Sequence, residues 1–172
     1  SHSSNNDICD SSTDPAGPES NGLSSFGTDV VKEMNRLGMM IDVSHISDKA
    51  FYDVIKLSKA PVIASHSSVR TIAHHNRNMT DDMIKALAKN GGVIQICLLD
   101  VYIKDPDTTS VRYKKEKELN HIYETRYESM TDDEKKKLRE EWRSMRENYP
   151  SVLPIVADCV DHIDYVKNLV GI

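Results

Sequence analysis

Two short apolar runs that each lead into a histidine decide the fold of this chain. The first is MMIDVSH, residues 39–45, and the second is VIASH, residues 62–66. A third run, VIQICL, covers residues 93–98 and follows a turn at Asn90-Gly91-Gly92. Runs this short with so few polar residues are typical of strands covered on both faces. We therefore predict three buried strands, the first over residues 39–44.

A helix is predicted before each of these strands. Ser24 or Ser25 can cap the first helix, Ser47 the second and Thr80 the third, and an apolar stripe at helical spacing follows each cap. Strands that alternate with helices indicate βαβ units and a parallel sheet. An α/β barrel and a doubly wound sheet both fit, and both place their chemistry at the carboxyl ends of the strands.

Composition excludes several classes of protein. Of 172 residues, 38% are hydrophobic and 28% charged, which is unlike most disordered chains. The net charge is -5, from 22 basic and 27 acidic residues, so we expect no nucleic-acid partner. No run approaches the ~20 apolar residues that a membrane span needs.

The three cysteines, Cys9, Cys97 and Cys159, are widely spaced and form no C-x-x-C motif. This spacing argues against a disulfide framework and against a cysteine-type zinc site. We expect three reduced thiols, with Cys97 and Cys159 in the core. One disulfide beside a free third thiol is the alternative.

We predict three parts along the chain. Residues 1–98 hold the central βα units, and residues 99–150 form a charged, mostly helical insertion. Residues 151–172 return with an amphipathic helix and the start of a further strand at 170–172. Within the insertion, Thr131 and Glu134 form a capping box that begins a helix of about 17 residues.

His45 and His66 are the strongest chemical signal. They occupy equivalent positions in consecutive βα units, so the parallel sheet would bring them side by side at its carboxyl edge, where two imidazoles can bind one cation. Each alone is more often a hydrogen-bonded loop residue, and a catalytic zinc site needs at least three protein ligands. His2 is the nearest candidate for a third ligand, and its alternative is a frayed terminal residue.

Arg77 follows the second strand and would lie near His66, where it can bind a carboxylate or phosphate with two hydrogen bonds. Its alternative is a surface ion pair with Asp81 or Asp82. Asp42, inside the first strand, is either a structural acid or a support for a histidine. Among the other histidines, His162 is expected in the core, His74 and His75 in a loop, and His121 without a role.

These residues stand in stretches that resemble the membrane (renal) dipeptidase family, zinc metallopeptidases of the amidohydrolase type. The resemblance is specific because several motifs occur in order at matching spacing. It covers nearly all of residues 1–98 and the last helix, and it is weaker over residues 104–150. The matching stretches are 22–27, 31–38, 41–47, 60–68 and 77–81, together with the opening His2-Ser3.

The resemblance implies an α/β fold, a (β/α)₈ TIM barrel of which this chain would supply about three complete strands with their helices, plus the helical insertion. It implies two zinc ions and hydrolysis of small dipeptides by a metal-activated hydroxide. His45 and His66 would bind zinc. His2 would be catalytic and contact the substrate carbonyl. Arg77 would hold the substrate carboxylate, and Tyr102 would line the pocket.

The family's other metal ligands and its catalytic Asp have no match in this chain. We therefore expect a middle segment with at most one partial zinc site, inactive alone. An amidohydrolase acting on another amide or a lactone, and a non-catalytic module derived from a barrel, are the alternatives. We also expect a homo-oligomer, or association through exposed barrel edges.

Overall fold

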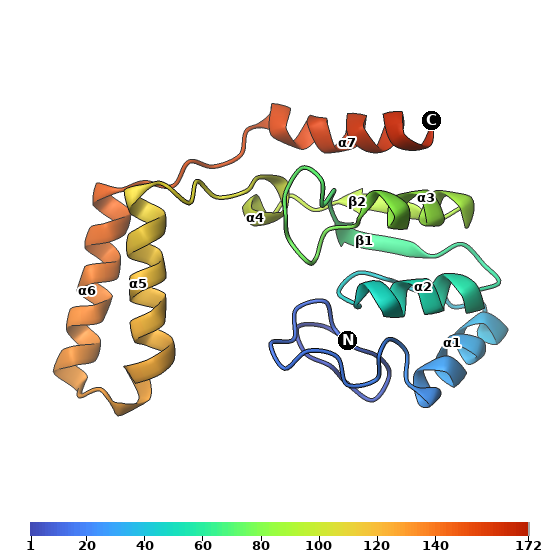
Figure 1. Cartoon of the computed structure of the whole chain (residues 1–172), viewed down its shortest axis with the longest axis horizontal. Helices are drawn as coiled ribbons and strands as arrows, with labels where there is room; N and C mark the ends of the chain where they lie inside the picture. The colour runs from blue at the N-terminus through green and yellow to red at the C-terminus, as the bar shows by residue number, and fades with distance from the viewer. Residues whose placement is uncertain (172) are drawn as a thin grey trace. The chain divides into compact units, whose positions relative to one another are not determined.

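A computed structural model describes residues 1–171, which form two compact units. Unit 1 comprises Ser1–Asp105 and Pro154–Ile172, and unit 2 comprises Pro106–Leu153. Figure 1 traces the order of the elements from the blue N-terminus to the red C-terminal helix. Unit 1 is a mixed α/β structure of several helices and a small sheet, and it carries every candidate site residue.

The first two helices begin and end where their sequence signals predict. α1 spans Ser25–Leu37, with the Ser24 side chain accepting a hydrogen bond from the backbone N–H of Gly27. It ends at Gly38, whose φ of 71° lies in the left-handed region that glycine adopts without strain. α2 spans Asp48–Leu57 and is capped by Ser47. Residues 1–22 precede α1 without a helix, as predicted.

The sheet contains two parallel strands, β1 (Ile63–Ser67) and β2 (Val93–Ile96), connected through α3 (Asp81–Lys89). Thr80 caps α3 as predicted. β1 extends past the predicted end of its strand, so His66 lies within it. In Figure 1, β1 and β2 run side by side. The second and third predicted strands are thus confirmed, with shifted ends.

The predicted strand over residues 39–44 is wrong. This segment makes only one isolated parallel bridge, between Asp42 and Ile63, with Val43 N–H donating to Ile63 C=O at 2.7 Å. Pairing stops there because the next backbone donor of β1, the N–H of Ser65, donates to the Asp42 carboxylate at 3.2 Å. The backbone then turns sharply, with His45 at a φ of 75°.

The core of unit 1 lies between the helices and the sheet. Apolar side chains from α1, α2, β1, α3 and the last helix form one buried cluster, which includes Val31, Phe51, Val62, Ile84 and Val166. Burying a side chain of this size contributes about 1.5–3 kcal/mol. This cluster fixes β1 against α2 and α3, and it thereby positions the end of β1 where His66 lies.

α7 spans Val156–Val170 and ends at Gly171, so the predicted strand start at 170–172 is wrong for the two described residues, and Ile172 lies outside the description. His162 on α7 is fully buried, as expected of a core histidine. Its Nδ1 accepts from Val69 N–H at 3.0 Å, and its Nε2 lies 2.9 Å from the C=O of Ile103, the last residue of α4 (Asp100–Ile103). Only a ring with its proton on Nε2 satisfies both contacts.

The thiols follow the sequence prediction only in part. Cys9, Cys97 and Cys159 are all free within the described chain. Cys9 is the buried one, at 2% exposure, because the N-terminal loop folds over it. Cys97 and Cys159 are only partly buried, so their expected place in the core is wrong.

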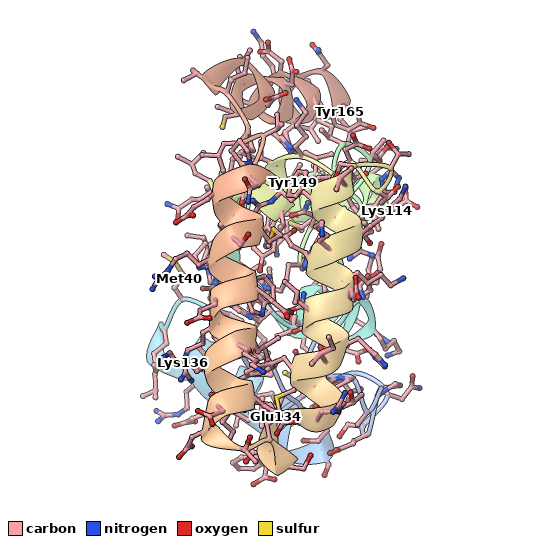
Figure 2. All side chains as sticks on the ribbon, turned by 90° about the vertical axis from the view of Figure 1, so that its left-hand side faces the viewer. Met40, Lys114, Glu134, Lys136, Tyr149 and Tyr165 are labelled. Atoms are coloured by element: carbon pink, nitrogen blue, oxygen red, sulfur yellow. The ribbon has the colours of Figure 1, made fainter. Side chains whose placement is uncertain are left out.

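Unit 2 is a helical hairpin of α5 (Val111–Arg126) and α6 (Asp132–Asn148), joined by the short helix η1 (Tyr127–Ser129). Figure 2 faces this hairpin and shows Glu134 and Lys136 on α6. The capping box of Thr131 and Glu134 is present, as predicted. A small cluster of Leu119, Leu138 and Met145 joins the helices.

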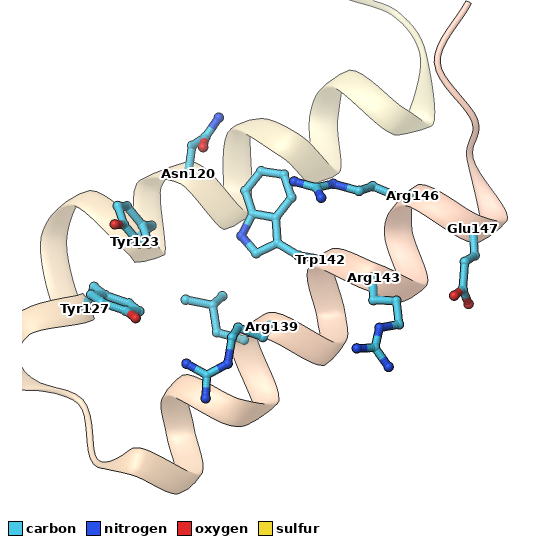
Figure 3. Close-up of a pocket in the computed structure, with 9 residues that line it drawn as sticks. Asn120, Tyr123, Tyr127, Arg139, Trp142, Arg143, Arg146 and Glu147 are labelled. Carbon is cyan, nitrogen blue, oxygen red and sulfur yellow. The ribbon is translucent and has the colours of Figure 1, made fainter.

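A groove of about 800 Å³ runs along one side of this hairpin, beside Trp142 (Figure 3). Tyr123 and Tyr127 line it from one end, and Arg146 lies over the indole of Trp142 at 5.4 Å. This groove contains none of the candidate catalytic or metal-binding side chains. No described helix is long and apolar enough to cross a membrane.

Candidate metal and substrate site

Three histidines from three separate segments meet in unit 1. The rings of His2 and His45 stack with their centroids 4.0 Å apart, and the ring of His66 lies 4.8 Å from that of His45. The structure therefore brings together the pair that the sequence singled out, and it adds His2. This position argues against the alternative of His2 as a frayed terminal residue.

The N-terminal loop is held against the turn that carries His45. Ser12 N–H donates to His45 C=O at 2.8 Å, and Ser11 forms a bridge with Ile46. The hydroxyl of Ser11 also donates to His2 C=O at 2.8 Å. These contacts explain how a residue next to the first position of the chain comes to lie on the ring of His45.

His45 is held in its neutral form. Burial, together with charge repulsion from the nearby Arg77, His2 and His66, lowers its pKa to about 4. The Nδ1 atom of His45 is buried and has no hydrogen-bond partner among the described residues. A neutral imidazole with an unpartnered nitrogen is the form in which histidine binds a metal.

Asp42 lies next to this cluster and is linked to it through the hydroxyl of Ser65. It is exposed, not buried, and its carboxylate accepts hydrogen bonds from the backbone N–H groups of Ser44 and Ser65 and from the hydroxyl of Ser65. Desolvation of its carboxylate would by itself raise the pKa of Asp42, but these hydrogen bonds outweigh that effect and lower it. The Ser65 hydroxyl also lies 2.7 Å from Nδ1 of His66.

Arg77 is buried, at 4% exposure, and forms no ion pair with Asp81 or Asp82. The surface-pair alternative is therefore wrong; Asp81 binds the hydroxyls of Thr71 and Tyr165 instead. Arg77 donates from Nη2 to His66 C=O at 3.1 Å, and its Nε has no partner among the described residues. Burial lowers the pKa of Arg77. A buried guanidinium with free donors can bind an anionic group.

Tyr102 and His75 complete the surroundings of Arg77. The Tyr102 ring lies 5.5 Å below the guanidinium, and the His75 ring packs on Tyr102 at 4.6 Å. Arg77 N–H donates to Nδ1 of His75 at 3.1 Å. Nothing in the sequence marked His75, because a pair of loop histidines carries no periodic signal.

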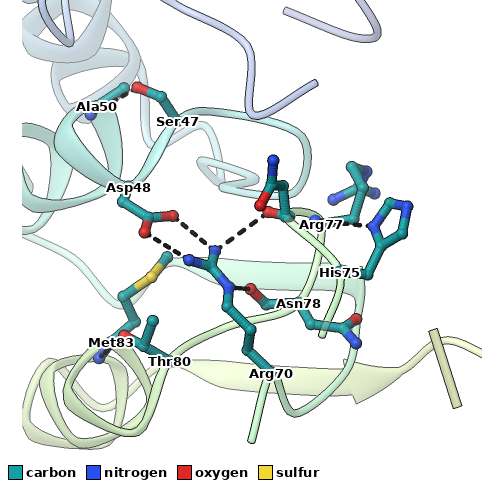
Figure 4. Close-up of polar contacts among 10 residues, drawn as sticks. Ser47, Asp48, Ala50, Arg70, His75, Arg77, Asn78, Thr80 and Met83 are labelled. Carbon is teal, nitrogen blue, oxygen red and sulfur yellow. Dashed lines mark hydrogen bonds and ion pairs between the residues drawn. The ribbon is translucent and has the colours of Figure 1, made fainter. Parts of the chain in front are cut away.

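Arg70 and Asn78 hold the loop that carries Arg77 (Figure 4). Arg70 binds Asp48 at the start of α2 through two hydrogen bonds of 2.7 Å and donates from Nε to Asn78 C=O. The buried amide of Asn78 accepts from Ser68 N–H and donates to Tyr102 C=O at 2.9 Å. The end of β1, the loop and Tyr102 are thereby fixed to one another.

The three histidines are a candidate for part of a metal site. Within residues 1–171, no group of three or more His, Cys, Asp or Glu side chains is arranged to hold a metal ion. The stacking of His2 on His45 explains this, because stacked rings direct their in-plane lone pairs side by side instead of toward one point. His45 and His66 remain candidates for two ligand positions, and a complete catalytic site needs at least one more.

Comparison with known proteins identifies the family of this chain. Residues 1–172 match the membrane dipeptidase family, peptidase family M19. The chain belongs to this family. Dipeptidase tcpJ of Claviceps purpurea is 44% identical over 111 residues, which are 64% of this chain and 26% of that protein. Dipeptidase verJ of Clonostachys rogersoniana is 49% identical over 98 residues, 57% of this chain and 25% of that protein.

A solved structure of similar fold is that of the probable dipeptidase PvdM from Pseudomonas aeruginosa. It superposes with a TM-score of 0.77 at 27% identity, over 99% of this chain and 47% of that structure. The chain spans about a quarter of the length of the two fungal dipeptidases. Nearly the whole of this chain thus matches the family, whereas the match covers less than half of the length of each of these relatives.

Proposed function

We propose that this chain is a central segment of a zinc-dependent dipeptidase that adds water across the peptide bond of small dipeptides. The observation that carries the proposal is the meeting of His2, His45 and His66, with Arg77 hydrogen-bonded to the backbone of His66. Bound zinc would supply a hydroxide nucleophile at neutral pH and polarise the scissile carbonyl.

In this proposal, His45 and His66 are metal ligands, and two ions would occupy the complete family site, with at most one partial site in this chain. His2 acts as the catalytic donor that contacts the substrate carbonyl and stabilises charge on its oxygen. Arg77 binds the substrate's terminal carboxylate, for which its unpartnered Nε offers a free donor. Tyr102 lines the same pocket beneath the guanidinium.

We also propose that residues 1–98 are part of a (β/α)₈ TIM barrel, that residues 99–150 are an insertion, and that residues 151–172 return to the barrel. The parallel pairing of β1 with β2 through α3 supports this proposal. The extensive superposition on PvdM supports it as well. Strands outside this chain would supply the remaining metal ligands.

The isolated chain should bind zinc weakly and hydrolyse no dipeptide. Zinc affinity is measured by competition with a chelating dye, and turnover with a panel of dipeptides that have a free carboxylate. Replacing both His45 and His66 with Gln should abolish the weak binding, whereas His121→Gln, on an exposed residue of α5, should leave it unchanged. Measurable turnover would contradict the inactivity of the segment.

In the complete protein, Arg77→Gln should raise KM far more than it lowers kcat, because the guanidinium would bind substrate and transition state equally. The alternative of a non-catalytic barrel module is favoured by one observation, the lack of a three-ligand group among residues 1–171. A parent reading frame without further His, Asp and Glu ligands would favour that alternative and overturn the proposal.

A further inference from the structure

Three polar side chains form a continuous path that ends at one candidate metal ligand. The carboxylate of Asp42 contacts the hydroxyl of Ser65, and that hydroxyl lies 2.7 Å from Nδ1 of His66. The path joins two neighbouring segments of the sheet, since Asp42 lies on the bridged segment and Ser65 and His66 lie in β1. Neither Asp42 nor Ser65 has a role in the proposed function.

The directions of the hydrogen bonds along this path follow from the number of protons available. An ionised carboxylate can only accept, and Asp42 already accepts at Oδ1 from Ser44 N–H at 2.9 Å and from Ser65 N–H at 3.2 Å. Its close contact with the Ser65 oxygen must therefore contain the single hydroxyl proton of Ser65. That hydroxyl has no second proton, so it accepts from His66.

We propose that Asp42 and Ser65 are positioning residues that fix His66 with its proton on Nδ1 and leave the lone pair on Nε2. Further contacts hold the backbone of the same residue. His66 N–H donates to the hydroxyl of Ser44 at 3.0 Å, and Nη2 of Arg77 donates to His66 C=O at 3.1 Å. Both the ring and the backbone of His66 are thus restrained before any ligand binds.

The consequence for chemistry rests on the proposed function, in which His66 is a metal ligand. A ligand histidine that donates its other ring N–H to a fixed acceptor is held in the orientation and tautomer that coordination requires. His45 has no such support on its Nδ1. The two candidate ligands therefore differ: His66 is oriented by a hydrogen-bonded path, and His45 by the packing of its ring between His2 and His66.

Nitrogen NMR of the metal-free chain tests the tautomer directly. With ¹⁵N-labelled histidine at about pH 8, where an ordinary histidine is neutral, His66 should show a protonated Nδ1 and an unprotonated Nε2. The His66→Gln variant identifies the signals by their disappearance. A protonated Nε2, or the averaged signals of a free histidine side chain, would overturn the proposal.

Three substitutions separate this role from a purely structural one. In Asp42→Asn, the side-chain oxygen still accepts from the backbone N–H groups of Ser44 and Ser65. The amide nitrogen therefore faces the Ser65 hydroxyl and donates to it. Ser65 must then donate to His66, and the proton of His66 should move to Nε2. Ser65→Ala should give averaged signals, and Ser65→Thr should restore the original tautomer. Unchanged His66 signals in Asp42→Asn would contradict the path.

Asp29→Asn is the matched control, because Asp29 is an exposed acid of α1 that pairs only with Lys32. It should leave the histidine signals unchanged. Zinc titration is a separate measurement. If the complete protein binds no zinc but His66 of the chain carries its proton on Nδ1, the proposed function is refuted and this inference stands. Zinc binding by a His66 that carries its proton on Nε2 in the metal-free state would refute the inference alone.

Discussion

Asp10 is the residue around which the N-terminal loop is built. It is 1% exposed and accepts backbone hydrogen bonds from Glu19, Ser20 and Gly22 at 2.7–2.9 Å. Asp10→Asn would turn an N–H group toward donors that need an acceptor. We expect this variant to lose about 1.5–3 kcal/mol of stability at neutral pH, measured by urea unfolding. The control is Asp29→Asn, at an exposed position, which should leave the free energy of unfolding nearly unchanged.

The same contacts predict a pH dependence. Burial alone would raise the pKa of Asp10, but the N–H groups of Ser20, Gly22 and Glu19 stabilise its charge, and its pKa falls below 3.8. The unfolded chain therefore binds this proton at a higher pH than the folded chain. The stabilisation is fully present above about pH 4 and is lost as the pH falls through the folded-state pKa. The difference in free energy of unfolding between the wild type and Asp10→Asn should become smaller in acid. A difference that does not change with pH would contradict this account.

His162 tests the value of a buried polar contact between segments distant in sequence. In His162→Leu, Val69 N–H and Ile103 C=O both lose their partner in a site closed to water. We expect a loss of about 2–4 kcal/mol in the free energy of unfolding. His121→Leu, at an exposed position of α5, should change it by less than about 0.5 kcal/mol. Equal effects of the two variants would contradict the role of His162.

At this scale, sequence reasoning succeeded where a repeated pattern existed. His45 and His66 occupy matched positions in consecutive units, so their meeting could be predicted. Asp10 and His75 belong to irregular loops, where position depends on turns that no periodicity encodes. The burial of Arg77 was missed for the same reason, since the loop fixed by Arg70 and Asn78 folds back over it.

Among the elements, α6 depends on its N-terminal capping box. The hydroxyl of Thr131 accepts from Glu134 N–H, and the Glu134 carboxylate accepts from Thr131 N–H at 2.8 Å. Thr131→Ala should destabilise the hairpin by about 0.5–2 kcal/mol, seen as faster amide exchange at the start of α6. Thr125→Ala is the control, because that hydroxyl only bonds back to His121 C=O within α5. Equal exchange in both variants would contradict the role of the cap.

Helices with a cap and an apolar stripe were predictable at this scale, and two of the predicted strand segments were wrong. Caps and apolar stripes act locally, so α1, α2, α3 and α6 begin where the sequence signals stand. The run at 39–44 has the apolar character of a strand, but Asp42 bends the chain by binding Ser44 N–H. The predicted strand start fails at residues 170 and 171, because Val170 still packs as the last residue of α7, against the core of unit 1.

At the scale of the whole molecule, unit 1 exposes an apolar groove of about 410 Å³ between α3, β2 and α7. Val93 and Ile163 line it and are more than half exposed. We propose that copies of this chain associate through this groove and the free edge of β2. Sedimentation should show a concentration-dependent oligomer.

Charge placed in this groove should weaken the association. Val93→Glu and Ile163→Glu should shift the equilibrium toward the monomer. Met40→Glu provides the control, because Met40 is also exposed and apolar but does not line the groove. A wild-type chain that remains monomeric at all concentrations would refute the association.

Unit 1 is interrupted between Asp105 and Pro154, and yet the segments that flank the interruption meet: Lys104 Nζ lies 3.0 Å from Asp158 Oδ1. The entropy of closing a loop grows only with the logarithm of its length, about 0.6 kcal/mol for each doubling. Lengthening or shortening the hairpin therefore changes the stability of unit 1 very little. The stability of the unit that carries the histidines thus depends little on the hairpin. The hairpin can therefore vary in length and sequence while the site is retained.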